Sequence, residues 1–293
     1  MMLWKTIFAL VTLVLVTSCQ LITGSPTSTA SPSVTPFPPG LTATPKTNTT
    51  TPFPSASHTP VLTPLPSGTP HGELPEEAIL ILEPGPGSQL IDSIHLAGIA
   101  GPTFESHLLV QLMLEDGSTM TSLPITIQAE MGSRGPFEVD IPFTVQERRQ
   151  AFILVSSSSP RDGGTTHLAS AGVTLAPEGA VEIRPATLHT ERIHITQPML
   201  NETLSGSPAH VQGFAMASFE GTLVIDLLDA EGNLLATQPI IVQAAEMGQY
   251  GPFEVELPFQ VIAPGAGRLV VHDPSVVFQG DVHLASVEVN LAP

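Results

Sequence analysis

Short apolar segments alternate with polar and turn-forming residues through most of the chain after residue 76. In Phe253-Glu254-Val255-Glu256-Leu257, the apolar and acidic positions alternate strictly, which indicates a strand with one buried and one wet face. No window here shows a long helical period. Acidic residues followed by glycine, as at Asp116-Gly117, separate the segments and are typical of turns between strands. The pattern therefore predicts an all-β protein.

The predicted strands form two matching sets. The first set comprises residues 79–82, 94–98, 104–114, 125–128, 137–143, 152–155 and 168–175, and the second comprises 193–195, 209–213, 219–228, 240–243, 253–259, 269–271 and 284–291. Seven short strands over about 100 residues are typical of an antiparallel immunoglobulin-like β-sandwich. We therefore expect two such domains in tandem.

Two stretches are spelled twice in the chain. AEMGSRGPFEVDIPF, from Ala129, returns as AEMGQYGPFEVELPF from Ala245, and HLASAGVTLAP, from His167, returns as HLASVEVNLAP from His283. The spacing is far longer than the 20–50 residues of a solenoid repeat, so the repeats indicate two copies of one domain. We place the domains at residues 76–177 and 191–293, with a short linker at 178–190.

Residues 1–19 predict a lipoprotein signal peptide. Lys5 precedes an apolar core of about 10 residues, which is too short to span a bilayer comfortably. The sequence Val16-Thr17-Ser18-Cys19 resembles the lipobox of bacterial lipoproteins, which implies that Cys19 is lipidated and becomes the new N-terminus. Two acyl chains would anchor the protein stably. We therefore expect an extracytoplasmic protein that is attached to the cell membrane through Cys19, with an ordinary signal peptide or an uncleaved anchor as the alternatives.

Residues 20–75 are dominated by Ser, Thr and Pro, as in Thr35-Pro36-Phe37-Pro38-Pro39. Such a segment has no apolar period around which a core can form, so we predict a disordered linker. Repeated proline favours extended conformations. The segment would therefore act as a stalk between membrane and domains.

The charge distribution limits the choice of partners. All 27 acidic residues lie at or after Glu73, against seven arginines and no lysine, which gives this part a formal charge of −20. Such a surface repels nucleic-acid phosphates and anionic lipid head groups, so we expect neither as a partner. The single cysteine and single tryptophan, Cys19 and Trp4, both fall in the leader. The domains therefore lack thiols and must be held together by apolar packing.

No motif predicts catalysis, a cofactor or a metal site. The histidines that occupy matching places, His95 with His210 and His167 with His283, lie on different predicted strands and lack the close spacing of a ligand set. We interpret them as structural or surface residues. Glu105 and its counterpart Glu220, which we expect at the start of the longest strand, lack the further oxygen ligands of a calcium loop.

The repeated turn offers one candidate contact site. Gly132 and Gly135 bracket Ser133-Arg134, while Gly248 and Gly251 bracket Gln249-Tyr250. Glycines of this kind admit positive φ angles in turns. If these turns are exposed, Arg134 and Tyr250 would form small contact loops that differ between the domains.

The combined pattern resembles a known family. A Pro-Gly opening, a strand ending in glycine, a Phe-Glu pair, an acidic-Gly turn, Gly-Pro-Phe-Glu and a final valine-rich strand occur in both copies, over residues 78–176 and 192–292. This is similar to Gmad2, the immunoglobulin-like domain of bacterial spore germination proteins. The first copy departs from the pattern at Gly163-Gly164. The resemblance implies an extracytoplasmic domain, often attached to lipoproteins, with no catalytic residues to carry over.

These observations favour a non-enzymatic binding or scaffolding protein of the bacterial envelope, with a spore-germination-like context as one setting. Its partner would be an envelope protein or a wall glycan. A peptidoglycan- or polysaccharide-binding module is the alternative, although the domains are poor in the aromatic residues on which sugars stack. A purely structural spacer and an envelope hydrolase are the remaining alternatives, and nothing in the sequence supplies the paired acids of a hydrolase.

Overall fold

The computed structural model describes residues 74–217 and 219–293. The strands of the first domain are β1 (Ile79–Glu83), β2 (Gln89–Ile91), β3 (Ser93–Ala100), β4 (His107–Leu114), β5 (Thr119–Thr126), β6 (Gly135–Pro142), β7 (Arg149–Ser158) and β8 (Thr165–Ala176). Those of the second are β9 (Ile193–Gln197), β10 (Thr203–Ser205), β11 (Ala209–Ala215), β12 (Thr222–Asp229), β13 (Leu234–Ile241), β14 (Gly251–Leu257), β15 (Gly265–Pro274) and β16 (Asp281–Ala292). The predictions for the leader, for Cys19 and for most of the stalk lie outside the described residues.

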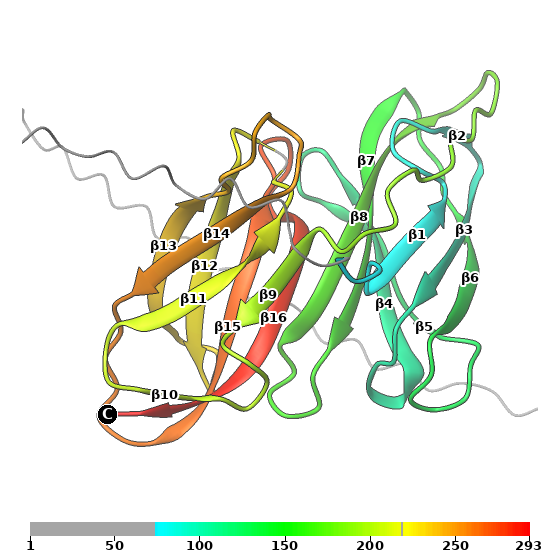
Figure 1. Cartoon of the computed structure of the whole chain (residues 1–293). Coiled ribbons are helices and arrows are strands. Elements are labelled where there is room, and N and C mark those ends of the chain that lie inside the picture. The colour runs from blue at the N-terminus through cyan, green and yellow to red at the C-terminus, as the bar shows by residue number, and fades with distance from the viewer. Residues whose placement is uncertain (1–73, 218) are drawn as a thin grey trace, which may run out of the picture. The chain divides into compact units, whose positions relative to one another are not determined.

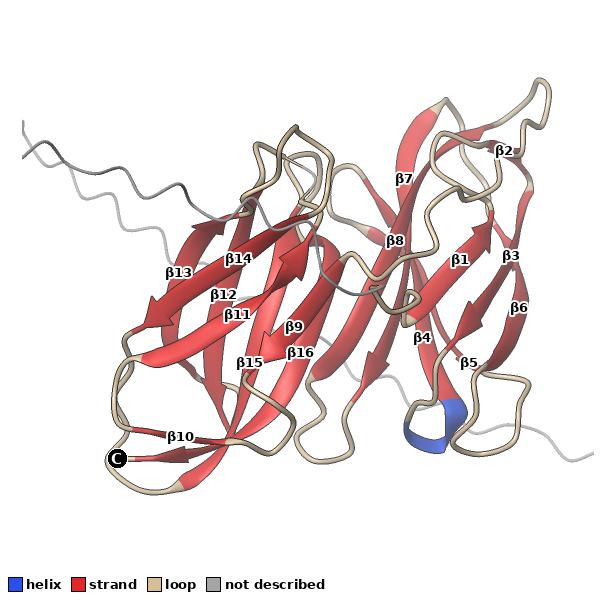
Figure 2. Ribbon diagram, in the orientation of Figure 1, coloured by secondary structure: helices blue, strands red, loops and turns tan. Residues whose placement is uncertain are grey.

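Each set of strands forms a sandwich of two sheets, as predicted (Figures 1 and 2). In the first domain, the sheet β1-β3-β6 faces the strands β8-β7-β4-β5, and in the second, β9-β11-β14 faces β16-β15-β12-β13. Most pairings are antiparallel. The exceptions are two short parallel ones, in which β2 pairs with β8 and β10 pairs with β16.

Each sandwich has its own apolar core, and the cores match residue for residue at several positions. Phe137 in β6 and Phe253 in β14 are fully buried in equivalent places, and Ile79 and Ile193 begin the equivalent strands β1 and β9. The aliphatic and phenylalanine side chains of alternate strand positions fill both cores. The packing thus follows the alternation read from the sequence.

The structure corrects one predicted element in each domain. The run from Phe104 to Leu114 is not one strand, because Phe104–Ser106 form a short 3-10 turn, η1, and β4 begins only at His107. Glu105 and its counterpart Glu220 both have positive φ angles, of 52° and 47°, so they lie in turns rather than at the start of a strand. The longest strands are instead β8 and β16, with 12 residues each.

Candidate functional site

The two domains are joined by a sheet that runs from one into the other. β8 pairs with β16 in antiparallel register, with His283 opposite Ala169, Leu284 opposite Leu168 and Ala285 opposite His167. These are the two copies of the repeated His-Leu-Ala-Ser sequence, and β8 and β16 lie side by side in Figure 1. All the described residues belong to one compact unit. The repeat is therefore the edge through which the domains meet.

The register is that of a half-turn rotation. Leu168 and Leu284 are equivalent residues and face each other, so the rotation axis passes between them. The serines that follow also reach across, since the Ser170 hydroxyl donates a hydrogen bond to the Val282 carbonyl and the Ser286 hydroxyl donates one to the Thr165 carbonyl. Two copies of one domain thus meet as the subunits of a symmetric dimer do.

The segments that lead into β1 and β9 repeat this symmetry. The Glu77 amide donates to the His189 carbonyl at 2.9 Å, and the equivalent Glu191 amide donates to the Pro75 carbonyl at 2.9 Å. These backbone bonds place the two glutamates on either side of the axis.

Glu77, Glu191 and His283 form a buried cluster between the domains. His283 Nε2 lies 3.1 Å from Glu77 Oε1 and 3.4 Å from Glu191 Oε1. The exposed fractions of the three residues are 6%, 4% and 2%. Each carboxylate also accepts a backbone hydrogen bond from the opposite domain, Glu191 from the Ala78 amide at 2.7 Å and Glu77 from the Arg192 amide at 3.1 Å.

The electrostatics of this cluster follow from burial and from the two carboxylates. Burial disfavours the charged imidazole of His283, but hydrogen bonds to Glu191 and Glu77 outweigh burial and raise its pKa to about 9. Burial also opposes ionisation of Glu191, yet the hydrogen bond from His283 holds the pKa of that carboxyl below its usual range. With a proton as the only cation, one imidazolium therefore bridges two carboxylates.

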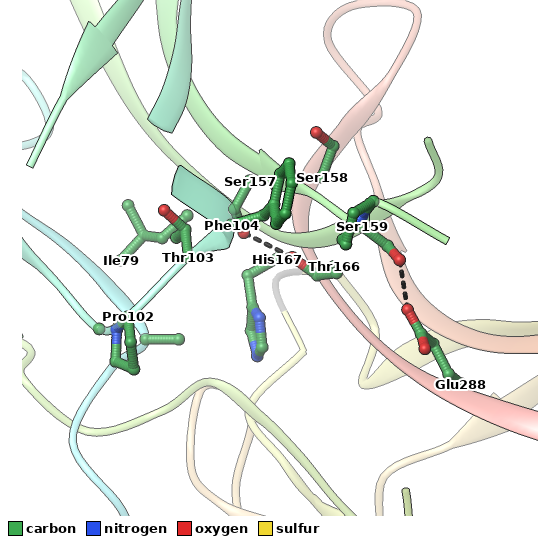
Figure 3. Close-up of a pocket in the computed structure, with 13 residues that line it drawn as sticks. Ile79, Pro102, Thr103, Phe104, Ser157, Ser158, Ser159, Thr166, His167 and Glu288 are labelled. Carbon is green, nitrogen blue, oxygen red and sulfur yellow. Dashed lines mark hydrogen bonds between the residues drawn. The ribbon is translucent and has the colours of Figure 1, made fainter. Parts of the chain in front are cut away.

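His167, the counterpart of His283, lies at the edge of a cavity of about 370 Å³ between the domains. Figure 3 shows its ring pointing away from the hydroxyls of Ser157 and Thr166, which lie 2.6 Å apart. The figure also shows the hydrogen bond from Ser159 to Glu288 of the second domain. Burial lowers the pKa of His167. The two matching histidines thus have opposite pKa shifts in one interface.

The hairpin loops that precede β8 and β16 each reach onto the other domain, with different chemistry. Asp162 accepts two hydrogen bonds from the buried Arg268, at 2.6 Å and 3.0 Å. At the position related by the half-turn, the rings of Phe278 and Phe152 pack at a centroid distance of 4.2 Å. The neighbouring Gly164 leaves room for the Arg268 side chain, since a Cβ there would lie 2.6 Å from Arg268 Nε. The first copy departs from the family pattern at Gly163-Gly164, and this is a place where the first domain contacts the second.

The predicted contact residues, Arg134 and Tyr250, make intramolecular contacts and are only partly exposed. The Arg134 guanidinium donates to the Glu77 carbonyl at 2.9 Å, and the Tyr250 hydroxyl donates to the Thr190 carbonyl at 3.0 Å. Burial raises the pKa of Tyr250 to about 12. Each side chain thus holds the segment that precedes the first strand of a domain. That Arg134 and Tyr250 also contact a partner remains a prediction.

The other matching histidines form exposed pairs across strands. His95 Nδ1 lies 2.9 Å from Asp140 Oδ1, and the equivalent His210 Nδ1 lies 3.0 Å from Glu256 Oε1. Each histidine is directly opposite its acid in the register. Both imidazoles thus contact an acid of the neighbouring strand at the protein surface.

Comparison with known proteins gives no curated protein that matches the chain. Among solved structures, similar ones include dimeric latent PorU from Porphyromonas gingivalis (12% identity, TM-score 0.26) and red sea bream transglutaminase (13%, 0.26). The match covers 74% and 75% of this chain but only 20% and 31% of those proteins. A chimeric titin Z1Z2 tandem shares 13% identity at a TM-score of 0.21, over 73% of this chain and 99% of that one. Within residues 74–217 and 219–293, no helix is long and apolar enough to cross a membrane.

A family match is found in both domains. The family described as the immunoglobulin-like domain of bacterial spore germination, Gmad2, matches residues 78–164 and 192–276. The matched regions begin directly after Glu77 and directly after Glu191. They include the strands up to β7 and β15 but end before β8 and β16. They confirm the predicted resemblance and the tandem arrangement, and the chain belongs to the Gmad2 family.

Proposed function

We propose that the protein is a non-enzymatic binding module, anchored outside a bacterial membrane by lipidated Cys19 and carried on the stalk of residues 20–75. Immunoglobulin-like Gmad2 domains suggest an extracellular binding module of this kind. One observation carries the proposal furthest. The pairing of β8 with β16 makes the two domains one body, and each domain offers the same exposed apolar loop.

These loops are the exposed turns between β5 and β6 and between β13 and β14. Met131 is 83% exposed in the first, and Met247 is 76% exposed at the equivalent place in the second. Exposed phenylalanines, Phe104 and Phe219, occupy a second equivalent pair of positions, in the segments before β4 and β12. Hydrogen bonds from Ile127 to Ser106 and from Val242 to Gly221 tie these segments to the strand ends near the methionine loops. We call the segments with Phe104 and Met131, and those with Phe219 and Met247, the apolar loop pairs.

The chemistry of these loop pairs favours a protein partner. Methionine adapts to irregular apolar surfaces and is used widely in protein recognition. In the second domain, a cavity of about 250 Å³ is lined by Glu220, Gly221 and residues 244–249 and offers room for an apolar side chain. Glycans stack on Trp or Tyr, and the only tyrosine, Tyr250, is half-buried against Thr190. A wall glycan is therefore the second choice of partner.

Anchoring is tested in the source organism. We expect wild-type protein to sediment with membranes and to incorporate a radiolabelled fatty acid, and the Cys19→Ala variant to do neither. A variant that still fractionates with membranes would remove lipidation from the proposal and leave an uncleaved signal anchor.

Binding is tested by photo-crosslinking in intact envelopes. A photoreactive amino acid replaces Met131 or Met247 in one set of variants and the almost fully exposed Ile262 in the control. We expect one discrete protein adduct from both loop positions, and none from position 262. In parallel, soluble protein is incubated with purified cell wall and sedimented. Saturable co-sedimentation without an adduct would support the glycan alternative, and neither result would leave a structural spacer.

A further inference from the structure

We propose that Glu77, Glu191 and His283 form a binding site for a divalent transition-metal ion, with Zn²⁺ the best match, that clasps the two domains together. The three potential ligand atoms lie within 4.8 Å of one another, and all three residues are buried. The proposal stands independently of any partner that the apolar loop pairs bind.

The spacing of the donors suits a small tetrahedral ion. Zinc–ligand distances of about 2.0–2.2 Å place neighbouring tetrahedral ligands roughly 3.3–3.5 Å apart. His283 Nε2 lies 3.1 Å and 3.4 Å from the two glutamate oxygens. The two glutamate oxygens lie within 4.8 Å of each other, so an ion at the centre of the cluster requires only that these two carboxylates draw closer together.

Charge balance also favours an ion. Two buried carboxylates around a neutral imidazole leave two negative charges away from water, and a proton on His283 cancels only one of them. Burial of an uncompensated charge is costly, whereas a divalent cation cancels both charges. Arg192 lines the adjoining cavity, but its guanidinium lies 3.2 Å from the buried carboxylate of Asp273 and thus has an acid of its own.

The surroundings hold the ligands in place. The second oxygen of each carboxylate accepts a backbone hydrogen bond, Glu77 from Arg192 and Glu191 from Ala78. Such outer contacts orient metal ligands and are typical of built sites. Because each bond comes from the opposite domain, the docked interface itself preorganises the site.

The cluster also has an entry path and an open coordination position. Glu77 and His283 line a cavity of about 240 Å³, and Glu191 and His167 line a second cavity of about 470 Å³. A water molecule in either cavity could complete four-coordination. The mixed nitrogen and oxygen donors suit Zn²⁺ and its first-row neighbours, while Ca²⁺ requires about 6–8 oxygen ligands.

His272 provides a matched control within the same domain. It also lies between two acids, but its Nδ1 is 2.6 Å from Asp281 and its Nε2 is 3.4 Å from Asp226. The two acids therefore approach opposite nitrogens of the ring, and a single ion cannot bind all three groups. His272 is thus a half-buried histidine that lies between two carboxylates without the geometry of a metal site.

The experiment uses the whole chain after Cys19, stripped with EDTA and titrated with ZnCl₂ by calorimetry and by native mass spectrometry. We expect one Zn²⁺ per chain with a dissociation constant at or below about 1 μM, and a higher melting temperature with zinc than with EDTA. Loss of an outer-shell contact alone weakens metal binding about 10–100-fold, so His283→Gln and Glu191→Gln should weaken it by about 100-fold or more. His272→Gln should bind zinc as the wild type does.

Two results would overturn the proposal. One is wild-type protein that takes up no stoichiometric zinc. The other is binding that persists unchanged in both ligand variants while circular dichroism shows them folded. If a variant does not fold, Co²⁺ added to the wild type keeps the test decisive. Intense visible absorption bands would support a tetrahedral nitrogen and oxygen site, and their absence would count against it.

Discussion

Arg268 is the largest side chain that is fully buried among the described residues, and acids from both domains hold its charge. Its guanidinium donates to Asp162 of the first domain and to Glu288 of the second, at 2.6 Å and 3.2 Å, and to the Ser286 hydroxyl at 2.8 Å. A buried charge with this many partners is tolerated only while the partners remain. Arg268 therefore makes folding of the second domain and docking of the first depend on each other.

Replacement of Arg268 by methionine should lower the free energy of unfolding by about 3–5 kcal/mol, because Asp162 and Glu288 would lose the charge that compensates them. Urea denaturation measures the difference. Arg149→Met is the control, because Arg149 also contacts two acids, Glu115 and Asp116, but at an exposed site. There we expect a much smaller loss, because ion pairs at the surface contribute little to stability. Equal losses in both variants would contradict a special role for the buried network.

His272 should make stability depend on pH. Burial lowers its pKa, but the hydrogen bond to Asp281 and the charges of Asp281 and Asp226 outweigh burial and raise the pKa above that of the unfolded chain. The resulting stabilisation is complete below the unfolded value of about 6.5 and is lost as the pH rises through the folded pKa. His272→Gln should therefore destabilise the protein more at pH 5.5 than at pH 9, as measured by urea denaturation at both pH values. An identical loss at both would contradict this role.

Sequence reasoning could not assemble the cluster of Glu77, Glu191 and His283. Spacing rules detect ligands that lie close together on one element, and these three come from two lead-in segments and the last strand. A signal was nevertheless present in the sequence. Glu77 and Glu191 each lie two residues before the first isoleucine of their domain, and the His-Leu-Ala-Ser repeat is identical in both domains. Only the register of β8 on β16 shows that the two repeats meet.

At the scale of elements, alternation predicted the strands well but not their ends. The buried positions of β6 and β14 follow the expected period of two, which depends only on local side-chain direction. The 3-10 turn at Phe104 escaped prediction because the apolar Phe104 was taken as the start of the apolar run that continues through β4. The short strands β2 and β10 escaped because three residues carry no detectable period.

The glycines of the family pattern are explained by the phenylalanine that lies directly opposite each of them on the neighbouring strand. A Cβ on Gly98 would lie 2.3 Å from the Phe137 ring, and one on Gly213 would lie 2.4 Å from the Phe253 ring. We expect Gly98→Ala and Gly213→Ala each to lower the melting temperature, at a cost of about 1–3 kcal/mol for overpacking. Gly265→Ala is the control, since a Cβ there meets nothing within 4 Å. If thermal unfolding is unchanged in all three variants, the strands are free to move apart.

For the whole molecule, the interface predicts that the two domains behave as one body. A specific protease site inserted after Glu178, in the exposed part of the linker, allows the covalent connection to be cut. We expect the two halves to elute together in size-exclusion chromatography after cleavage, because the shared sheet, the buried cluster and the two hairpin contacts remain. Separate elution after cleavage would show that the linker alone keeps the domains together.

The half-turn relation between the domains also affects how the sequence of each domain can evolve. In a dimer of identical subunits, every substitution at the interface appears twice, so a mutation that suits one side of the axis must also suit the other. Duplication within one chain removes this coupling. The ionic contact of Arg268 with Asp162 and the aromatic contact of Phe152 with Phe278 occupy the two sides of one axis. Each half has become a partner for the other rather than for its own copy, since pairing of like halves would set phenylalanine against aspartate or against arginine.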